Sequence, residues 1–125
     1  MPGNSRPCHE LFLHAARSFQ PAYWEPPVDA YQTSRGWVLK YELAGIRPDE
    51  VHVTVSGRVI TVRGVRRDVR IGSCQQSHCM EISYNQFSRS LELPVDLSRL
   101  HISTDYRDGM LLVFLTPEGP AHEPS

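Results

Sequence analysis

The chain has 125 residues and a nearly balanced charge, with 13 basic against 14 acidic side chains and a formal net charge of -1. This length fits one domain with a single core. The charge balance gives no bulk attraction to nucleic acid or to anionic membranes, and no stretch reaches the ~20 apolar residues of a membrane span. The N-terminus lacks the features of a secretory signal, and three cysteines are an odd and low count. We therefore expect a cytoplasmic protein that binds neither nucleic acid nor membranes.

Proline positions divide the chain into an arm, a body and a tail. Of the 10 prolines, most lie in the first 27 residues or after residue 116. We expect residues 1–27 to form an arm that is partly helical or disordered, residues 28–117 to form the domain, and residues 118–125 to form a flexible tail.

The arm carries a short helical pattern. Phe12, Ala16 and Phe19 recur at i, i+4 and i+7, which predicts an amphipathic helix bounded by Pro7 and Pro21. A helix of about twelve residues is marginal alone. It therefore needs a partner surface, either on the domain or on another molecule.

Along the body, apolar side chains alternate with polar ones, as in half-buried strands. The alternation covers residues 37–43, 51–55, 59–63, 80–84 and 87–93. Residues 51–63 predict a hairpin, and after the turn at Asp108-Gly109 a strand at 110–115 is apolar on both faces. That last strand is either central to a core or has one face exposed for a partner. The short strands at this spacing predict an all-β fold, an antiparallel immunoglobulin-like β-sandwich.

Residues 64–78 break the regular spacing of the strands. Loops of this length are uncommon inside a compact domain and are usually functional. Val65, Val69 and Ile71 keep a weak strand pattern, which predicts a strand that pairs outside its own sheet, as in a swapped dimer. The alternative is a mobile polar loop.

Four motifs, in this order, resemble the α-crystallin domain of the small heat-shock proteins, of bacterial type. Val28-Asp29-Ala30-Tyr31 is similar to the family's first strand, and Asp108-Gly109-Met110-Leu111 to its last. Residues 42–51 are similar to its strand-end signature, with Ala44 where the family usually has Pro. Residues 87–94 are similar to its Phe-x-Arg-x-aromatic-x-Leu-Pro strand, with Leu91 in place of the aromatic. The resemblance covers residues 28–117, and residues 64–78 fall where such members carry the strand exchanged with a neighbour.

This resemblance implies an ATP-independent chaperone, a holdase that binds partly unfolded proteins and limits their aggregation. The sequence also lacks a Gly-x-Ser-x-Gly elbow, a Gly-rich phosphate loop and a His-Glu-x-x-His pair. We therefore expect no enzyme activity, no catalytic residue and no cofactor. The alternative is a co-chaperone or adaptor module, similar to the CS domains, that binds one specific folded partner.

Two clusters of polar side chains are weaker candidates for chemistry. Cys74, His78 and Cys79 lack the paired spacing of structural zinc, so we expect no metal site, although a redox or metal role stays open. The arginines of residues 63–70 have no aromatic residue between Arg58 and His78 to stack on bases. This favours a solvated or salt-bridged surface over one that binds nucleic acid.

Arg89 shares the strand face of Phe87 and Leu91, so its guanidinium points toward an apolar side. An unpaired charge there is costly, and it needs a carboxylate or carbonyl partner. The alternative is a side chain that extends past the strand edge to solvent. The resemblance implies a structural role in the dimeric domain.

The expected homodimer forms by strand exchange, with residues 66–71 of one chain pairing beside residues 28–31 of its neighbour. The expected interface residues are Val28, Tyr31, Arg66, Val69, Ile71 and Arg89.

Clients are expected to contact apolar surface in two places. In the arm these contacts are Phe12, Leu13 and Phe19. The second place is a groove at the edges of the strands 51–55 and 87–93, which the family fills with a C-terminal Ile-x-Ile segment. Its expected residues are Val51, Val53, Val55, Phe87, Leu91 and Leu93.

The tail after Leu115 contains no Ile, Val or Leu and has three prolines. It therefore cannot supply the usual Ile-x-Ile bridge between subunits. We expect dimers to dominate, with the groove left open to a client or to the tail of a sister small heat-shock protein.

Overall fold

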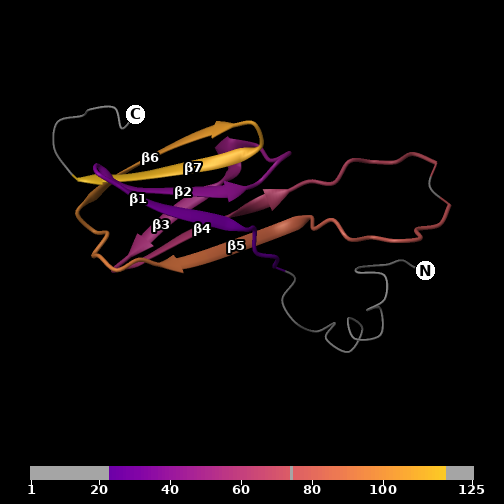
Figure 1. The fold of residues 1–125 in the computed structure, drawn as a ribbon. Helices are drawn as coiled ribbons and strands as arrows, with labels where there is room; N and C mark the ends of the chain where they lie inside the picture. The colour runs from indigo at the N-terminus through magenta and orange to yellow at the C-terminus, as the bar shows by residue number, and fades with distance from the viewer. Residues whose placement is uncertain (1–22, 74, 118–125) are drawn as a thin grey trace.

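Two antiparallel sheets pack face to face in the computed structural model, which describes residues 23–73 and 75–117 (Figure 1). Among these residues the elements are β1 (Val28–Thr33), β2 (Gly36–Glu42), the short 3₁₀ turn η2 (Pro48–Glu50), β3 (His52–Ser56), β4 (Val59–Arg66), β5 (Asn85–Glu92), β6 (Leu100–Arg107) and β7 (Met110–Pro117). One sheet has the order β1-β2-β7-β6 and the other β3-β4-β5. The predicted all-β sandwich is confirmed. The expected arm helix and the tail lie outside the described residues.

Tight turns join β1 to β2, β3 to β4 and β6 to β7. The hairpin of β3 and β4 predicted over residues 51–63 is present, with Gly57 at a φ of 63° in its turn. Asp108 and Gly109, at φ values of 53° and 79°, join β6 to β7. Positive φ at both central residues is the geometry that Asp-Gly supplies in a two-residue hairpin.

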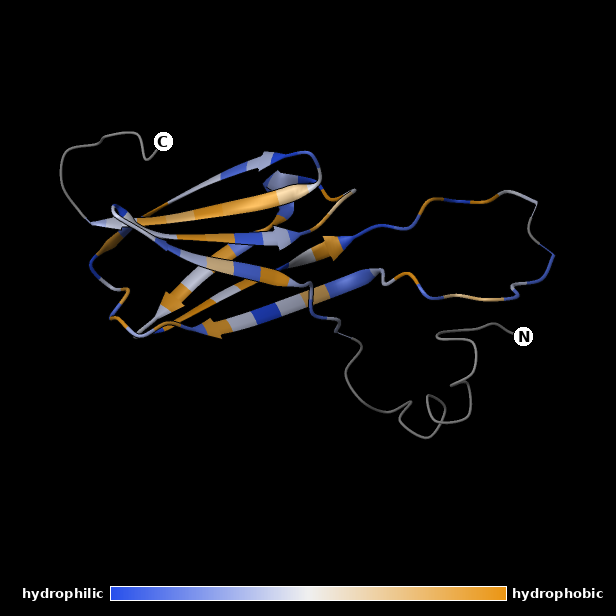
Figure 2. Cartoon of the chain, in the orientation of Figure 1, coloured by the Kyte–Doolittle hydropathy of each residue, from blue (hydrophilic) through white to orange (hydrophobic). Residues whose placement is uncertain are grey.

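Side chains alternate between the core and the outer surface as the period of a strand requires. On β7, Leu111, Val113 and Leu115 are buried, whereas Leu112 and Phe114 are half-buried on the outer face. Figure 2 shows the hydrophobic colour that runs along this strand. The strand at 110–115 is therefore central to the core on one face and partly exposed on the other. The buried core residues are Leu39, Tyr41, Leu43, Ile46, Ile60, Val62, Phe87, Leu93, Leu97, Leu111, Val113 and Leu115.

Within this core, the Tyr41 hydroxyl is buried and lacks a hydrogen-bond partner. Burial raises the pKa of Tyr41 to about 12, against a smaller opposing effect of the Arg89 charge. We expect Tyr41→Phe to raise the free energy of unfolding by about 1 kcal/mol at pH 7, because it removes a buried hydroxyl whose hydrogen bonds to water are lost on folding.

The same substitution should change the alkaline stability. The unfolded chain releases the tyrosine proton near pH 10 and the folded chain near pH 12, so this group costs stability as pH rises through that window. Urea unfolding at pH 8 and pH 11 should show a larger advantage of Tyr41→Phe at pH 11. A variant less stable than the parent at both values would contradict this account.

The segment before β1 closes one side of the sandwich. The backbone of Trp24 receives a hydrogen bond from Ser88 N at 3.0 Å and donates one to Gln86 O at 3.1 Å, which places it beside β5. Three residues later, Pro27 O accepts from Glu42 N of β2 at 3.0 Å. Residues 24–27 therefore run from one sheet to the other.

Arg89 holds this segment in place. Its Nη1 donates to the carbonyl of Pro26 at 3.1 Å, and the side chain is partly buried. The expected need for a carboxylate or carbonyl partner is thus confirmed, with a carbonyl as the partner. The contact lies within one chain.

The segment between β4 and β5 differs from the prediction. Pairing of β4 with β5 continues to Arg66 and Asn85, so the irregular segment covers residues 67–84 rather than 64–78. It projects from one end of the sandwich (Figure 1). The strand predicted at residues 80–84 is wrong, since the chain offers that segment no neighbouring strand edge and Ile82 is 67% exposed.

Candidate functional site

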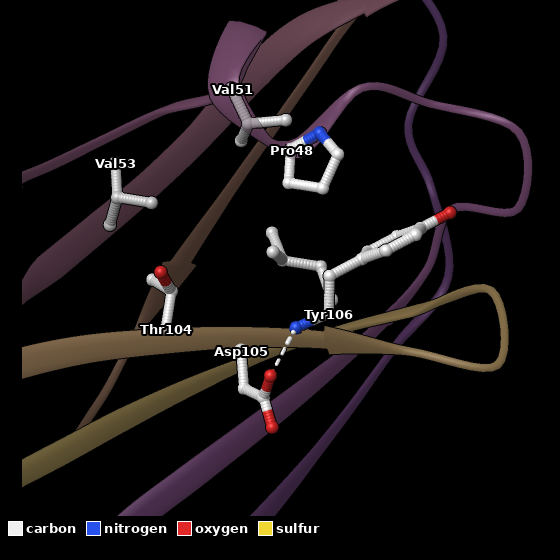
Figure 3. Close-up of a pocket in the computed structure, with 7 residues that line it drawn as sticks. Pro48, Val51, Val53, Thr104, Asp105 and Tyr106 are labelled. Carbon is white, nitrogen blue, oxygen red and sulfur yellow. Dashed lines mark hydrogen bonds between the residues drawn. The ribbon is translucent and has the colours of Figure 1, made fainter.

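The side of the sandwich opposite residues 24–27 is open. Among the described strands, β3 pairs only with β4 and β6 only with β7, so each has one outer edge without a backbone partner. Between these edges lies a pocket of about 350 Å³, shown in Figure 3. Its lining residues are Pro48, Val51, Val53, Thr104, Asp105, Tyr106 and Leu111.

Apolar side chains line part of this pocket, although polar atoms make up the larger share of its exposed surface. Val51 and Val53 face it because the odd residues of β3 are turned inward, and Leu111 of β7 is a buried lining residue. Tyr106 closes one end, where its hydroxyl donates to the carbonyl of Leu43 at 2.8 Å. This hydrogen bond fixes the ring, so the pocket has a defined shape.

The carboxylate of Asp105 does not place its negative charge inside the pocket. It accepts hydrogen bonds from Tyr106 N at 2.8 Å and from Arg107 Nε at 3.0 Å (Figure 3 draws the first). It turns to the side opposite Tyr106, as alternate residues of a strand do. An apolar segment can therefore enter the pocket without stripping water from a free charge.

Such a site suits the addition of a strand. An extended peptide can pair with the free edge of β3 or β6 and place alternate side chains into the apolar pocket. Backbone pairing gives affinity for many sequences, while the pocket selects apolar residues two positions apart.

The pocket shares one wall with the predicted groove. All three valines of this wall pack against the core, and of them Val51 and Val53 line the pocket. The other predicted wall is wrong because β4 lies between β3 and β5. Phe87 and Leu93 are 0% and 4% exposed in the core, and Leu91 is half-buried against it.

The second wall of the pocket is formed by β6, which was not predicted to be part of the site. Three even-numbered residues of β6, Leu100, Ile102 and Tyr106, point inward and pack against the core. That period-two signal is present in the sequence. Thr104 is polar and Pro48 lies in a turn, so neither contributes an apolar residue to that signal.

Arg66 is a contact within the chain rather than the start of an exchanged strand. Its Nη2 and Nη1 donate to Ser83 O at 2.9 Å and to Ala44 O at 3.2 Å. The guanidinium carbon lies 4.5 Å from the centre of the Trp24 ring and 5.7 Å from that of Tyr84. Arg66 was expected to pair with a neighbour, and in the single chain its backbone pairs with Asn85 of β5.

The other predicted interface residues lie on exposed backbone. Val28 and Tyr31 are on β1, whose outer edge has no partner strand among the described residues, and Tyr31 is 45% exposed. Val69 and Ile71 are each 70% exposed on the projecting segment. Phe12, Leu13 and Phe19 lie outside the described residues.

The polar clusters behave as structural surface. Arg67 Nη2 lies 3.0 Å from Glu50 Oε1, as the prediction of a salt-bridged surface indicated. Within residues 23–73 and 75–117, no three His, Cys, Asp or Glu side chains come together as metal ligands. Cys79 is in a disulfide. Its sulfur is therefore not a free thiolate for a metal.

In the described part of the chain, no helix has the length and apolar character needed to cross a membrane.

The chain is similar to known proteins in sequence and in fold. The family model described as "Hsp20/alpha crystallin family" matches residues 29–125 of the chain. The chain belongs to the Hsp20/alpha crystallin family. Members of this family are small heat-shock chaperones, which are not enzymes. The resemblance seen in the four sequence motifs is confirmed.

Individual members show the same relationship. The chain is 25% identical over 88 residues to "Small heat shock protein C4" of Rickettsia felis, covering 70% of this chain and 54% of that protein. It is 31% identical over 85 residues to "18 kDa antigen 2" of Mycobacterium avium, covering 68% of this chain and 60% of that protein. The chain thus spans little more than half the length of these curated relatives.

Solved structures of the family have the same fold. HSP18.5 from E. histolytica is similar with a TM-score of 0.64 and 27% identity, over 82% of this chain and 96% of that one. The hspA protein from Xanthomonas axonopodis is similar with a TM-score of 0.62 and 25% identity, over 80% of this chain and 100% of that one.

Proposed function

We propose that this chain is an ATP-independent holdase, which binds apolar segments of partly unfolded proteins and limits their aggregation. The observation that carries the proposal is the open pocket between β3 and β6, which Val51, Val53 and Leu111 help to line and which lies between two strand edges that no described strand pairs with. Membership of the small heat-shock family supports the same reading.

The pocket holds a client segment weakly and without a fixed sequence. It takes the side chains of two alternate residues, and each buried side chain of the size of Val or Leu contributes about 1.5 to 3 kcal/mol. Part of this gain offsets the lost freedom of the segment, so one site binds reversibly. The arm adds contacts through Phe12, Leu13 and Phe19, which increase the apolar surface offered to one client.

The working unit in this proposal is a homodimer formed by strand exchange. The projecting segment 67–84 presents Val69 and Ile71 to solvent, and β1 presents an open edge. Pairing the exposed segment of each chain with β1 of the other would cover both features. Because Arg66 is fixed within its own chain, the exchanged part begins after it.

Sister small heat-shock proteins are further partners in this proposal, through the same pocket.

We place the protein in the cytoplasm on its low and odd number of cysteines, and the disulfide at Cys79 is the observation that weighs against a reducing compartment.

A light-scattering assay with a heat-labile client tests the holdase. Without nucleotide, a molar excess of the full chain should suppress most of the scattering of the heated client. An adaptor that binds one folded partner would leave the scattering unchanged, and that result would overturn the proposal.

A further inference from the structure

We propose that the disulfide of Cys79 joins it to Cys74 and acts as a redox switch on the projecting segment, so that oxidation strengthens the dimer. This inference rests on the proposed strand exchange and names the chemistry that regulates it. The oxidant is a small-molecule disulfide and the reductant is a small-molecule thiol. Cys74 lies outside the described residues, and its assignment as the partner follows from the sequence.

The sequence offers two candidate partners for Cys79, which is in a disulfide. The chain has three cysteines, and the other two are Cys8 and Cys74. Cys74 is five positions away within the projecting segment, whereas Cys8 is far away along the chain, in the arm. The entropic cost of bringing two residues together grows with the length of chain between them, which favours Cys74. The bridge therefore closes a short loop near the turn at Gly72 and Ser73.

The surroundings of Cys79 suit a bond that opens and closes. The residue is exposed, so small disulfides and thiols reach its sulfur. Its Sγ lies 3.7 Å from a carboxylate oxygen of Glu81, which can accept a hydrogen bond from the thiol of the reduced form. The sulfur of Cys79 thus has a partner in both redox forms.

The reaction is thiol–disulfide exchange. The thiolate of one cysteine attacks the small disulfide, which forms a mixed disulfide and releases one small thiolate. The thiolate of the other cysteine then attacks the protein sulfur of the mixed disulfide, which closes the bridge and releases the second small thiolate. The two cysteines lose two electrons and two protons, and the small disulfide gains them as two thiols. A small thiol in excess reverses both steps.

Chain length determines what the bridge changes. The projecting segment is held at its base, where Arg66 pairs with Asn85. The outgoing part, from Arg66 to residue 74, spans up to about 26 Å when extended. The returning part, from residue 74 to Asn85, spans up to about 36 Å. Without a bridge, the returning part therefore has about 10 Å of surplus length.

The bridge removes this surplus. A disulfide holds the two Cα atoms within about 7 Å of each other, so the returning part then spans about 27 Å, close to the reach of the outgoing part. Two parts of equal length can run extended beside each other, and the bridged segment has fewer other conformations. The described residues of both parts contain no strand in the single chain, so this segment is not yet paired.

The exchange benefits from this restriction. Pairing along β1 of the neighbour requires the outgoing part, which carries Val69 and Ile71, to be extended. A segment with fewer competing conformations loses less entropy when it is ordered, so the bridged chain dimerises more tightly. Reduction weakens the dimer without abolishing it, because the apolar contacts of Val69 and Ile71 remain.

The switch also reconciles the disulfide with the proposed cytoplasmic location. Disulfides of cytoplasmic proteins are mostly transient and redox-sensing. In a reducing cytoplasm the pair is open and the dimer is weaker. A rise in small disulfides closes the bridge and favours the dimer, which is the working unit of the proposed holdase.

The test compares oxidised and reduced full-length protein. One sample is equilibrated with oxidised glutathione and the other with dithiothreitol, and non-reducing peptide mapping and gel electrophoresis identify the linked cysteines. We expect a link between Cys74 and Cys79 within one chain in the oxidised sample and no link in the reduced sample. Sedimentation velocity over a dilution series should then give a dimer dissociation constant roughly tenfold lower for the oxidised protein.

Two serine variants control for other effects of the oxidant. Cys8→Ser is the matched control and should keep the roughly tenfold difference, because the proposed bridge does not use Cys8. Cys79→Ser should dimerise as the reduced parent does under both conditions. Cys79 is exposed, so this substitution should leave the fold unchanged.

Each outcome has a distinct meaning. Equal dissociation constants of the oxidised and the reduced parent would overturn the switch and leave the exchange standing. A link from Cys79 to Cys8 or between two chains, or a redox difference that persists in Cys79→Ser, would also overturn it. A parent that is monomeric in both states would instead overturn the proposed exchange.

Discussion

Replacing Val69 and Ile71 by aspartate is expected to convert the protein from dimers to monomers at micromolar concentration. In the single chain, the side chains of Val69 and Ile71 are each 70% exposed. In the proposed exchange both become buried against the partner strand. Burial of two such side chains contributes about 3 to 6 kcal/mol, so their loss should weaken the dimer at least 100-fold. Sedimentation velocity on the full-length protein measures this directly.

The matched control for this prediction is Ile82→Asp, in the same projecting segment and 67% exposed. It lies outside the proposed exchanged part and should leave the dimer intact. A double variant Val69→Asp/Ile71→Asp that stays dimeric, or a parent that is monomeric under the same conditions, would rule out the exchange.

Gly36→Ala is expected to lower the free energy of unfolding by about 3 to 5 kcal/mol. Gly36 begins β2 at a φ of +139°, a conformation that side chains rarely adopt. An added Cβ would overlap the backbone carbonyl oxygen of Leu115 on the paired strand β7. The backbone cannot yield as a flexible side chain would, so the pairing of β2 with β7 must shift.

Gly57→Ala is the matched control for that loss of stability. Gly57 also has a positive φ, +63°, but nothing lies within 4 Å of an added Cβ. Only the conformational cost remains, about 1 to 2 kcal/mol. Urea unfolding should therefore place Gly36→Ala well below Gly57→Ala, and equal stabilities would contradict the steric explanation.

The strands and the hairpin at residues 51–63 could be predicted because period-two patterning and turn residues are local properties of the sequence. The groove could be predicted only in part. Val51 and Val53 share a face whatever the sheet order, but their opposite wall depends on which strand edge lies across the sandwich. Periodicity does not encode that choice, so β5 was taken in place of β6.

Contacts between residues far apart in the chain also could not be predicted from the sequence. The need of Arg89 for a polar partner follows from its strand face, but Pro26 is its partner only because residues 24–27 cross between the sheets. Arg66 was expected to pair with a neighbour because it begins the weak strand pattern of residues 66–71, and its aromatic contacts, Trp24 and Tyr84, are distant in the sequence.

The central claim is that the pocket between β3 and β6 holds unfolded clients, and two variants of one strand test it most directly. Val53→Asp puts a charge into the pocket, whereas Thr54→Asp puts the same charge on the exposed face of β3. Because Val53 also packs against the core, Val53→Asp should melt below Thr54→Asp, so the assay is run at a temperature at which both variants are folded. In the light-scattering assay, Val53→Asp should need at least threefold more protein for half suppression, while Thr54→Asp should match the parent. Identical suppression by both variants would contradict the claim.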